Sequence, residues 1–468
     1  MKHISILIAS FLFSLLFFDK SIGLNLSIFS IITIVFLGFY NLKAFKNLRI
    51  RFYTLAYIIT AIFVFVQHSG LSIIANCIAF FTLVGAISEQ NTSIYINWLN
   101  GMFTTIAAFF YKYISGNSSE EKVDWKKNID ILHLAKLIGI PLVFIIVFVL
   151  LYKNGNPVFN DLINTISFDF INFQWVLFTI LGYYLFSNIS KPVQIEPITS
   201  QDKQITDKLY KSEHFSEVQL KKEKQLGTTL LGLLNLLILL YIATDVTYLM
   251  TTNATTGTEL SSQVHNGINT LIASILIAIV IILYFFRGNL NFYSENKILK
   301  NLTYVWIILN VSLIGLIAIK NQNYIALYGL TYKRIGVYVY ILLTCVGLIT
   351  TFLKVLNIKN MVYLFRINTQ IAFILLIVFS TINWDHTITK YNLNTAQNFD
   401  ISYLINLSNR NAVLLYEQKD NIIASHEHKK RIDTKYWSYV EDVVQNEWQE
   451  YSYETFVISK KHPNSETK

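Results

Sequence analysis

The stretch INTLIASILIAIVIILYFF, residues 268–286, decides the class of fold. It contains no Asp, Glu, Lys or Arg. A helix that crosses the hydrocarbon layer of a bilayer needs about 20 mostly apolar residues, and this stretch is close to that length. A single segment in lipid is helical because a helix satisfies all of its backbone hydrogen bonds internally. We therefore predict a membrane-spanning helix here.

Similar apolar runs recur along the whole chain. They are continuous, and they are too long for the short alternating strands of a membrane barrel. The sequence therefore predicts an all-α, polytopic integral membrane bundle of about eleven or twelve transmembrane helices. The other candidate spans are 3–18, 22–42, 52–67, 70–88, 95–114, 134–152, 172–189, 226–247, 302–319, 335–353 and 367–384.

The composition excludes other classes of protein. Of the 468 residues, 53% are hydrophobic and 14% are charged, whereas a soluble domain carries roughly 25% charged residues. The two cysteines, Cys77 and Cys345, lie inside apolar runs, so a disulfide scaffold is not expected. Basic loops account for the formal net charge of +9, and nucleic acid is therefore not an expected partner.

The charges of the loops predict the orientation of the chain. Lys and Arg gather in loops 43–51, 190–225, 287–301 and 354–366, which we place in the cytoplasm because cytoplasmic loops are enriched in basic residues. Segment 248–267 contains neither Lys nor Arg and is predicted to be external. The N-terminus is then cytoplasmic and the C-terminal tail is external, in a bacterial cytoplasmic membrane.

Segment 95–114 is the weakest candidate span. Loop 115–133 is also basic, and three candidate spans separate it from loop 43–51, although two cytoplasmic loops need an even number between them. We interpret the segment as re-entrant or interfacial, which leaves eleven spans. If it does cross the membrane, there are twelve spans and one basic loop is misplaced. Its polar residues include Asn97, Asn100, Thr104 and Thr105.

The chain is predicted to divide into a transmembrane domain, residues 1–384, and a C-terminal extramembrane tail, residues 385–468. The tail carries ten basic and twelve acidic residues, a net charge of −2, which leaves +11 for the remainder. Apolar residues recur at helical spacing in segment 435–457, which is typical of an amphipathic helix. We expect the tail to be small and mostly helical.

Two polar stretches flank late spans and form the candidate site. One precedes span 335–353 and the other follows the last span, and both are predicted to be external. The basic residues of the first stretch contradict the usual charge rule, which favours a functional role. Arg334 would pair with Asp385 or bind an anionic head group; alternatively, both stretches are structural, with Trp384 anchoring the interface. The candidate residues are Thr331, Lys333, Arg334, Asp385, His386 and Asn392.

Catalytic motifs are absent from the sequence. It contains no phosphate-binding loop, nucleophile elbow or metal-ligand spacing, so no catalytic residue, cofactor or metal is predicted. Asp245, near the end of span 226–247, is expected to reach water at the interface rather than to bind a ligand. The leading hypothesis is a non-enzymatic transport, envelope or signalling component. Its expected partners are the lipid bilayer and a small molecule, lipid head group or envelope protein; the alternative is a membrane enzyme acting on lipid-linked or envelope substrates.

Three short motifs carry a resemblance to a known family. Gly23-Leu24-Asn25 opens the second span, Gly329-Leu330-Thr331 is followed by Arg334, and Asn392 follows the last span. With residues 400–408, they resemble an uncharacterised bacterial polytopic membrane family, of the domain-of-unknown-function 4173/4153 type, over about residues 10–415. The resemblance implies a shared fold and carries over no catalytic residue.

Overall fold

The computed structural model describes residues 2–114, 172–213, 216–251 and 257–461, together with scattered positions between 141 and 159. Within these residues the regular elements are helices, with one isolated bridge between Lys208 and Lys359. Seven of the described helices are long and apolar enough to cross a membrane, and two shorter ones are also apolar. The predicted all-α, polytopic class is confirmed. Candidate span 134–152 falls largely outside the described residues.

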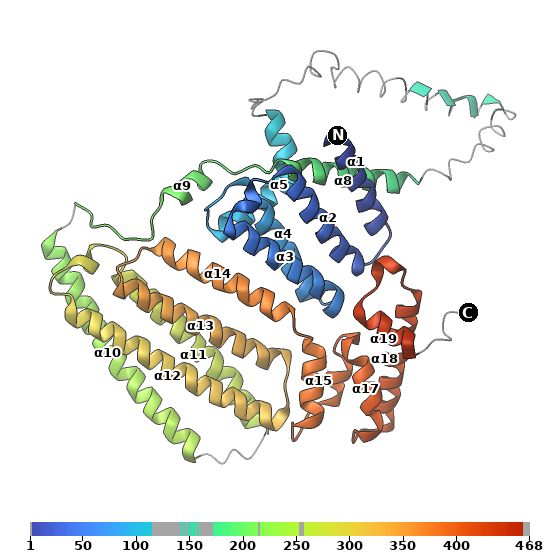
Figure 1. Ribbon diagram of the computed structural model, residues 1–468. Helices are drawn as coiled ribbons and strands as arrows, with labels where there is room; N and C mark the ends of the chain where they lie inside the picture. Colours follow the sequence, from blue (N-terminus) through green and yellow to red (C-terminus); the bar gives the residue numbers. More distant parts are fainter. Residues whose placement is uncertain are drawn as a thin grey trace.

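The first bundle collects the N-terminal helices around an aromatic core (Figure 1). Phe29, Phe36 and Phe186 meet at its centre, where the rings of Phe36 and Phe186 lie 4.9 Å apart, centre to centre. Its helices are α1 (Lys2–Phe17), α2 (Leu24–Tyr40), α3 (Leu48–Gln67), α4 (Gly70–Ser88), α5 (Ile94–Ile114) and α8 (Phe173–Ser190). Helices α5 and α8 are not among the seven, so their crossing of the membrane, and the re-entrant interpretation of 95–114, remain predictions.

Helices α4 and α5 pack unusually close together. A Cβ atom built on Gly85 would lie 1.7 Å from the Asn97 carbonyl oxygen, and one on Gly101 would lie 1.8 Å from that of Phe81. Glycine therefore lets the two backbones touch. Helices in lipid gain their association from such close packing, because lipid tails are as apolar as the side chains they replace.

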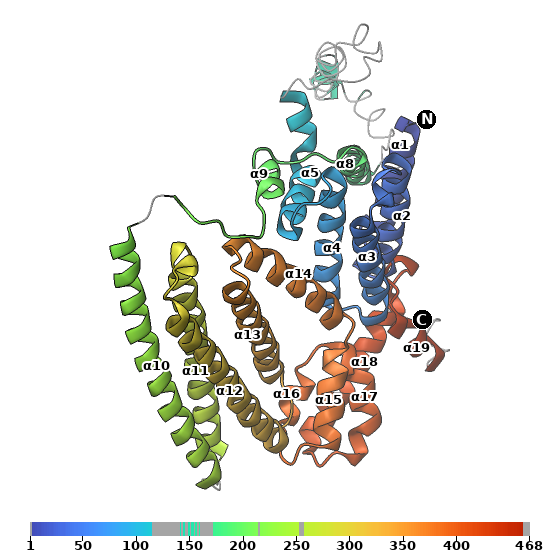
Figure 2. The same ribbon diagram turned by 60° about the vertical axis from the view of Figure 1, so that its left-hand side comes forward.

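The second bundle lies beside the first (Figure 2). Its core contains fully buried residues such as Leu231, Ile282 and Leu348. The outer face stays apolar, since Leu237 is 63% exposed and Ile308 is 64% exposed, as expected of side chains that face lipid. The helices are α10 (Glu217–Thr251), α11 (Gly257–Phe285), α12 (Lys297–Tyr328) and α13 (Tyr332–Leu356).

Helix α14 (Met361–Ser380) lies between the bundles and contacts α13 on one side and α3, α4 and α5 on the other. Its residues Phe373 and Ile377 belong to the core of the first bundle. After it, the chain forms a helical tail of α15 (Trp384–Asn394), α16 (Ile401–Ile405), α17 (Ala412–Gln418), α18 (His426–Gln445) and α19 (Tyr453–Lys461). The predicted boundary at 384/385 remains a prediction.

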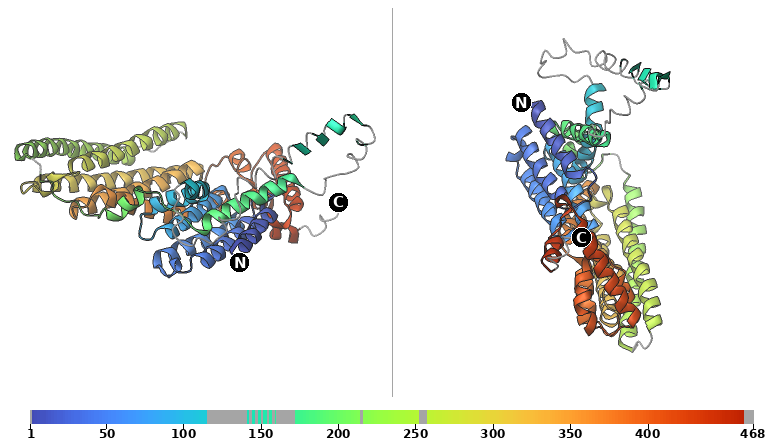
Figure 3. Two further views of the ribbon diagram at one scale, coloured as in Figure 1. Left: turned by 90° about the horizontal axis from the view of Figure 1, so that it is seen from above. Right: turned by 90° about the vertical axis from the view of Figure 1, so that its right-hand side faces the viewer.

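The tail lies against one end of both bundles (Figure 3). It meets the second bundle through α15, and it meets the turn between α1 and α2 through residues 447–451. There, the Leu24 amide donates to the Tyr451 carbonyl at 2.8 Å, and the Ser21 amide donates to Glu450 Oε1 at 2.7 Å. Gly23 is required at this contact, because a Cβ atom would lie 2.3 Å from the Glu450 carbonyl oxygen.

The basic loops lie together at the opposite end of the bundles (Figure 1). Segment 191–213 runs across this end and is held by Arg366 of α14, whose guanidinium donates to Asp207 at 2.6 Å and to the Ser93 hydroxyl at 2.9 Å. Asp202 accepts from the Ser93 amide at 2.7 Å and from the Ser93 hydroxyl at 2.6 Å. The segment thus joins the α4–α5 turn to α14.

We expect this attachment to weaken in acid. Burial raises the pKa of Asp202, but the hydrogen bonds from Ser93 and the charge of Arg366 outweigh it, so the pKa lies below its ordinary value. The stabilisation is complete above the unfolded pKa of about 4 and is lost as the pH falls through the lower folded pKa. Hydrogen exchange of residues 191–213, corrected for the intrinsic effect of pH, should rise in that window.

The variant Asp202→Asn should show the faster exchange already at neutral pH. The matched control is Asp420→Asn, because the side chain of Asp420 is 90% exposed. Equal protection of segment 191–213 in both variants would contradict the assigned role of Asp202.

Candidate functional site between the bundles and the tail

The two polar stretches predicted to form a site do meet, through Asn392. Its side-chain amide donates to the Leu330 carbonyl at 2.9 Å, and its Oδ1 accepts from the Leu330 amide. Asn392 therefore satisfies both backbone groups of one residue in the turn between α12 and α13. Gly329 precedes that residue with φ +79°, and a Cβ atom on it would lie 2.5 Å from Asn392 Oδ1.

Replacing Gly329 by alanine should lower the free energy of unfolding by about 2 kcal/mol, because the backbone conformation is essentially restricted to glycine and the added methyl group strikes Asn392. Denaturant titration in mixed micelles measures the change. Gly315→Ala, within α12, is the control, since nothing lies within 4 Å of its Cβ position. An equal effect of both variants would show that the Asn392 contact is unimportant.

Arg334 does not pair with Asp385, although such a pair was one of the two functional roles that the sequence suggested for it. Its Nη1 donates to the Tyr328 carbonyl at 2.8 Å and to the Gly329 carbonyl, and its guanidinium lies 3.9 Å from the centre of the Tyr324 ring. The carbonyls at the C-terminal end of a helix are partly negative and lack partners within the helix. Arg334 therefore caps α12, and Thr331 caps α13 by accepting from the Arg334 amide.

Asp385 pairs instead with Arg410, a residue that the sequence reasoning missed. Asp385 is 1% exposed, and its Oδ2 accepts from Arg410 Nη2 at 2.7 Å and from the Ser408 hydroxyl. Its Oδ1 accepts from the Tyr332 hydroxyl at 2.6 Å. A buried carboxylate needs a cation nearby, and the ten basic residues of the tail were the candidates once Asp385 was known to be buried.

The remaining predicted residues lie at the surface. Lys333 is exposed and borders a smaller cavity of about 360 Å³ that Arg334 and Tyr324 also line. His386 is exposed at the start of α15. Loss of hydration beside neighbouring groups, and then the charge of Lys390, lower the pKa of its imidazole. No group of three His, Cys, Asp or Glu residues capable of holding a metal occurs within the described part of the chain.

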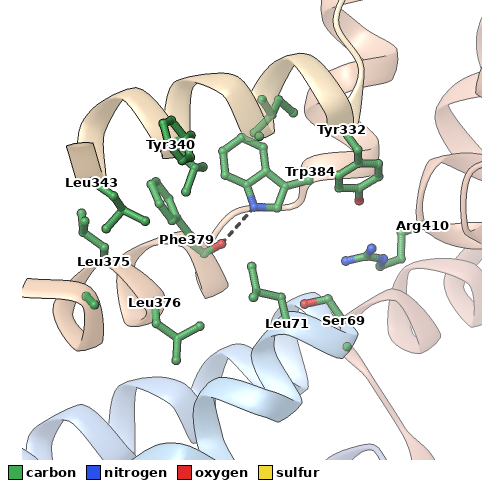
Figure 4. Close-up of a pocket in the computed structure, with 15 residues that line it drawn as sticks. Ser69, Leu71, Tyr332, Tyr340, Leu343, Leu375, Leu376, Phe379, Trp384 and Arg410 are labelled. Atoms are coloured by element: carbon green, nitrogen blue, oxygen red, sulfur yellow. Dashed lines mark hydrogen bonds between the residues drawn. The ribbon is translucent and has the colours of Figure 1, made fainter. Parts of the chain in front are cut away.

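A cavity of about 700 Å³ opens beside the Asp385–Arg410 pair (Figure 4). The start of α4 forms one wall, α13 and α14 form the others, and Trp384 of α15 closes one side. Most of its lining is apolar, including Leu71, Leu343 and Leu376 (Figure 4). Its polar end holds Ser69, Tyr332 and Arg410.

Arg410 has unused hydrogen-bonding capacity at this polar end. Its side chain is 16% exposed, and its Nη2 and Nε are engaged by Asp385 and Ser408. Its Nη1 is buried and donates no hydrogen bond to any described residue. Figure 4 shows the guanidinium directed towards the cavity. A buried guanidinium nitrogen without an acceptor is costly, so an acceptor supplied by a ligand would be stabilised there.

A family model described as a domain of unknown function, DUF4153, matches residues 6–418. The chain belongs to the DUF4153 family. The matched DUF4153 region contains the Asn392 contact, the Asp385–Arg410 pair and every wall of the cavity. It ends before α18 and before residues 447–451, which hold the α1–α2 turn. No curated protein and no solved structure matches the chain.

Proposed function

We propose that this DUF4153 protein is a non-enzymatic transport, envelope or signalling component that binds a membrane amphiphile with an anionic head group. The head group would bind the exposed part of the Arg410 guanidinium group, and the hydrocarbon chain would occupy the apolar cavity between α4, α13 and α14. The observation that carries the proposal is a guanidinium group, at the polar end of an otherwise apolar cavity, with one nitrogen that donates to no described residue.

The distribution of charge indicates how the protein is oriented in the membrane. The basic loops share one end, which we assign to the cytoplasm of a bacterial cell. The N-terminal end of α1 lies towards that side, because the opposite end of α1 reaches the tail through Lys20 and Glu447. The tail and the cavity then belong to the external side of the cytoplasmic membrane.

The alternative, a membrane enzyme, gains no support from this cluster. An acid or base that acts on a substrate must be free to exchange a proton with it. Asp385 instead accepts from Tyr332, Ser408 and Arg410, which orient it towards holding Arg410 in place.

The test uses the full-length protein, stripped of lipid in detergent and titrated with phosphatidylglycerol or phosphatidylcholine under native mass spectrometry. Arg410 is left intact, because its removal would leave Asp385 buried without a cation. Gly336→Phe fills the cavity instead, since Gly336 lines it and nothing lies within 4 Å of its Cβ position. Gly315→Phe, on α12 and away from the cavity, is the matched control.

We expect one tightly bound phosphatidylglycerol at this site, lost in Gly336→Phe and kept in Gly315→Phe. Inorganic phosphate should not compete with it, because the apolar chain supplies most of the binding. Retention of the lipid by Gly336→Phe, or equal binding of phosphatidylcholine, would refute the proposal.

A further inference from the structure

A second cavity, of about 710 Å³, opens on the other face of α14. Helices α3, α5 and α14 line it, and α14 contributes Gln370, Phe373 and Ile374. The first cavity uses residues 372, 375, 376 and 379 of the same helix. The second cavity is distinct from the first because it has different walls.

Two arginines border this second cavity. Arg49 and Arg51 lie in the first turn of α3 and are both exposed. Ion pairs at this end of the molecule engage Lys203 and Arg366, but neither Arg49 nor Arg51 pairs with a carboxylate among the described residues. The sequence from 42 to 88 contains no Asp or Glu. Two acids beside the α4–α5 turn are already paired, Glu89 with Lys203 and Asp202 with Arg366.

The rest of the cavity is apolar and open. Leu48 is 74% exposed, Leu55 is 54% exposed, Phe52 is 47% exposed and Ile374 is 44% exposed. Leu48 precedes the two arginines on α3, Phe52 and Leu55 follow them, and Ile374 lines the cavity from α14. A hydrocarbon chain in this space would cover them, and the gain grows with the apolar area covered.

We propose that this cavity binds an anionic glycerophospholipid of the leaflet at the basic end. The phosphate would lie between Arg49 and Arg51, and an acyl chain would lie along Phe52, Leu55 and Ile374. Guanidinium groups bind phosphate through paired charge-assisted hydrogen bonds. Basic pockets between membrane helices are suited to anionic head groups of the cytoplasmic leaflet. This site does not depend on the ligand proposed for the Arg410 cavity.

The experiment compares two double variants of the full-length, delipidated protein in detergent. Arg49→Gln/Arg51→Gln removes both cavity charges. Lys43→Gln/Lys46→Gln removes the same charge from the same loop, at exposed residues that do not line the cavity. Native mass spectrometry measures the affinity for phosphatidylglycerol relative to phosphatidylcholine, with inorganic phosphate as a competitor. Detergent removes the general attraction of a charged bilayer for both pairs of residues.

The arginine variant should lose roughly tenfold in its preference for phosphatidylglycerol, from the loss of two basic contacts, while the lysine variant changes little. Ile374→Trp, which fills the apolar part, should lose the lipid without any change of charge. Equal losses in both double variants, no loss in the arginine variant, or competition by inorganic phosphate would overturn the proposal. Gly336→Phe should leave this second lipid bound, so failure of one site is distinguishable from failure of the other.

Discussion

Asp385→Leu is expected to lower the free energy of unfolding by about 3–5 kcal/mol, the cost of breaking a buried ion pair from one side. The substitution strands Arg410, whose side chain is 16% exposed, and removes the acceptor of Tyr332 and Ser408. Denaturant titration of the purified protein in mixed micelles measures the loss.

Two further variants distinguish the loss of the Asp385–Arg410 ion pair from the general effect of replacing an aspartate by leucine. Asp385→Leu/Arg410→Met removes both charges and should recover most of the loss, because apolar replacement of a whole buried pair is often neutral. Asp433→Leu breaks the more exposed pair with Lys419, whose side chains are 39% and 22% exposed, and should cost at most about 1 kcal/mol. Equal losses of unfolding free energy in Asp385→Leu and Asp433→Leu would show that the buried pair contributes no more to stability than the exposed one.

The double variant Gly85→Ala/Gly101→Ala should separate α4 from α5 and cost about 3 kcal/mol. Each new methyl group would meet a backbone carbonyl oxygen, at 1.7 Å and 1.8 Å, so no side-chain rotation can relieve the overlap. The same titration measures the loss, and disulfide cross-linking between cysteines on the facing surfaces of α4 and α5 reports the separation.

Gly38→Ala/Gly315→Ala is the control for that experiment. Nothing lies within 4 Å of either Cβ position, and alanine is a better helix former than glycine. Stability should therefore be unchanged or slightly increased. A comparable loss in this control would mean that the spacing of α4 and α5 is not what the two glycines provide.

The helices were predictable because lipid imposes a simple rule on sequence. In the bilayer, a continuous apolar run of sufficient length forms a helix, because a helix satisfies its own backbone hydrogen bonds. The ends were less predictable: the run 226–247 lies inside α10, which extends over Glu217–Thr251. An apolar run marks only the apolar part of a helix, so the polar turns by which the helix extends at either end are not predicted from hydrophobicity.

The site was predictable only in part. Polar residues next to apolar spans indicated both the turn around Gly329 and the segment that contains Asn392. In the structure these two segments are in contact. The partners of the charges were not predictable, since Arg410 reaches Asp385 only through the packing of the tail. Asp245 was expected to reach water, but its side chain is 9% exposed and pairs with Lys320 at 2.5 Å.

The contact between the α1–α2 turn and residues 447–451 has a consequence for how the protein is made. Lys20 and Glu447 are 427 positions apart in the chain. During translation, the amide of Leu24 has no carbonyl of Tyr451 to bind until more than nine-tenths of the chain has left the ribosome. The turn between α1 and α2 therefore lacks these contacts while every later helix is being synthesised. A nascent chain released before residue 447 would lack all of these contacts, and its first helical hairpin would stay unattached to the tail.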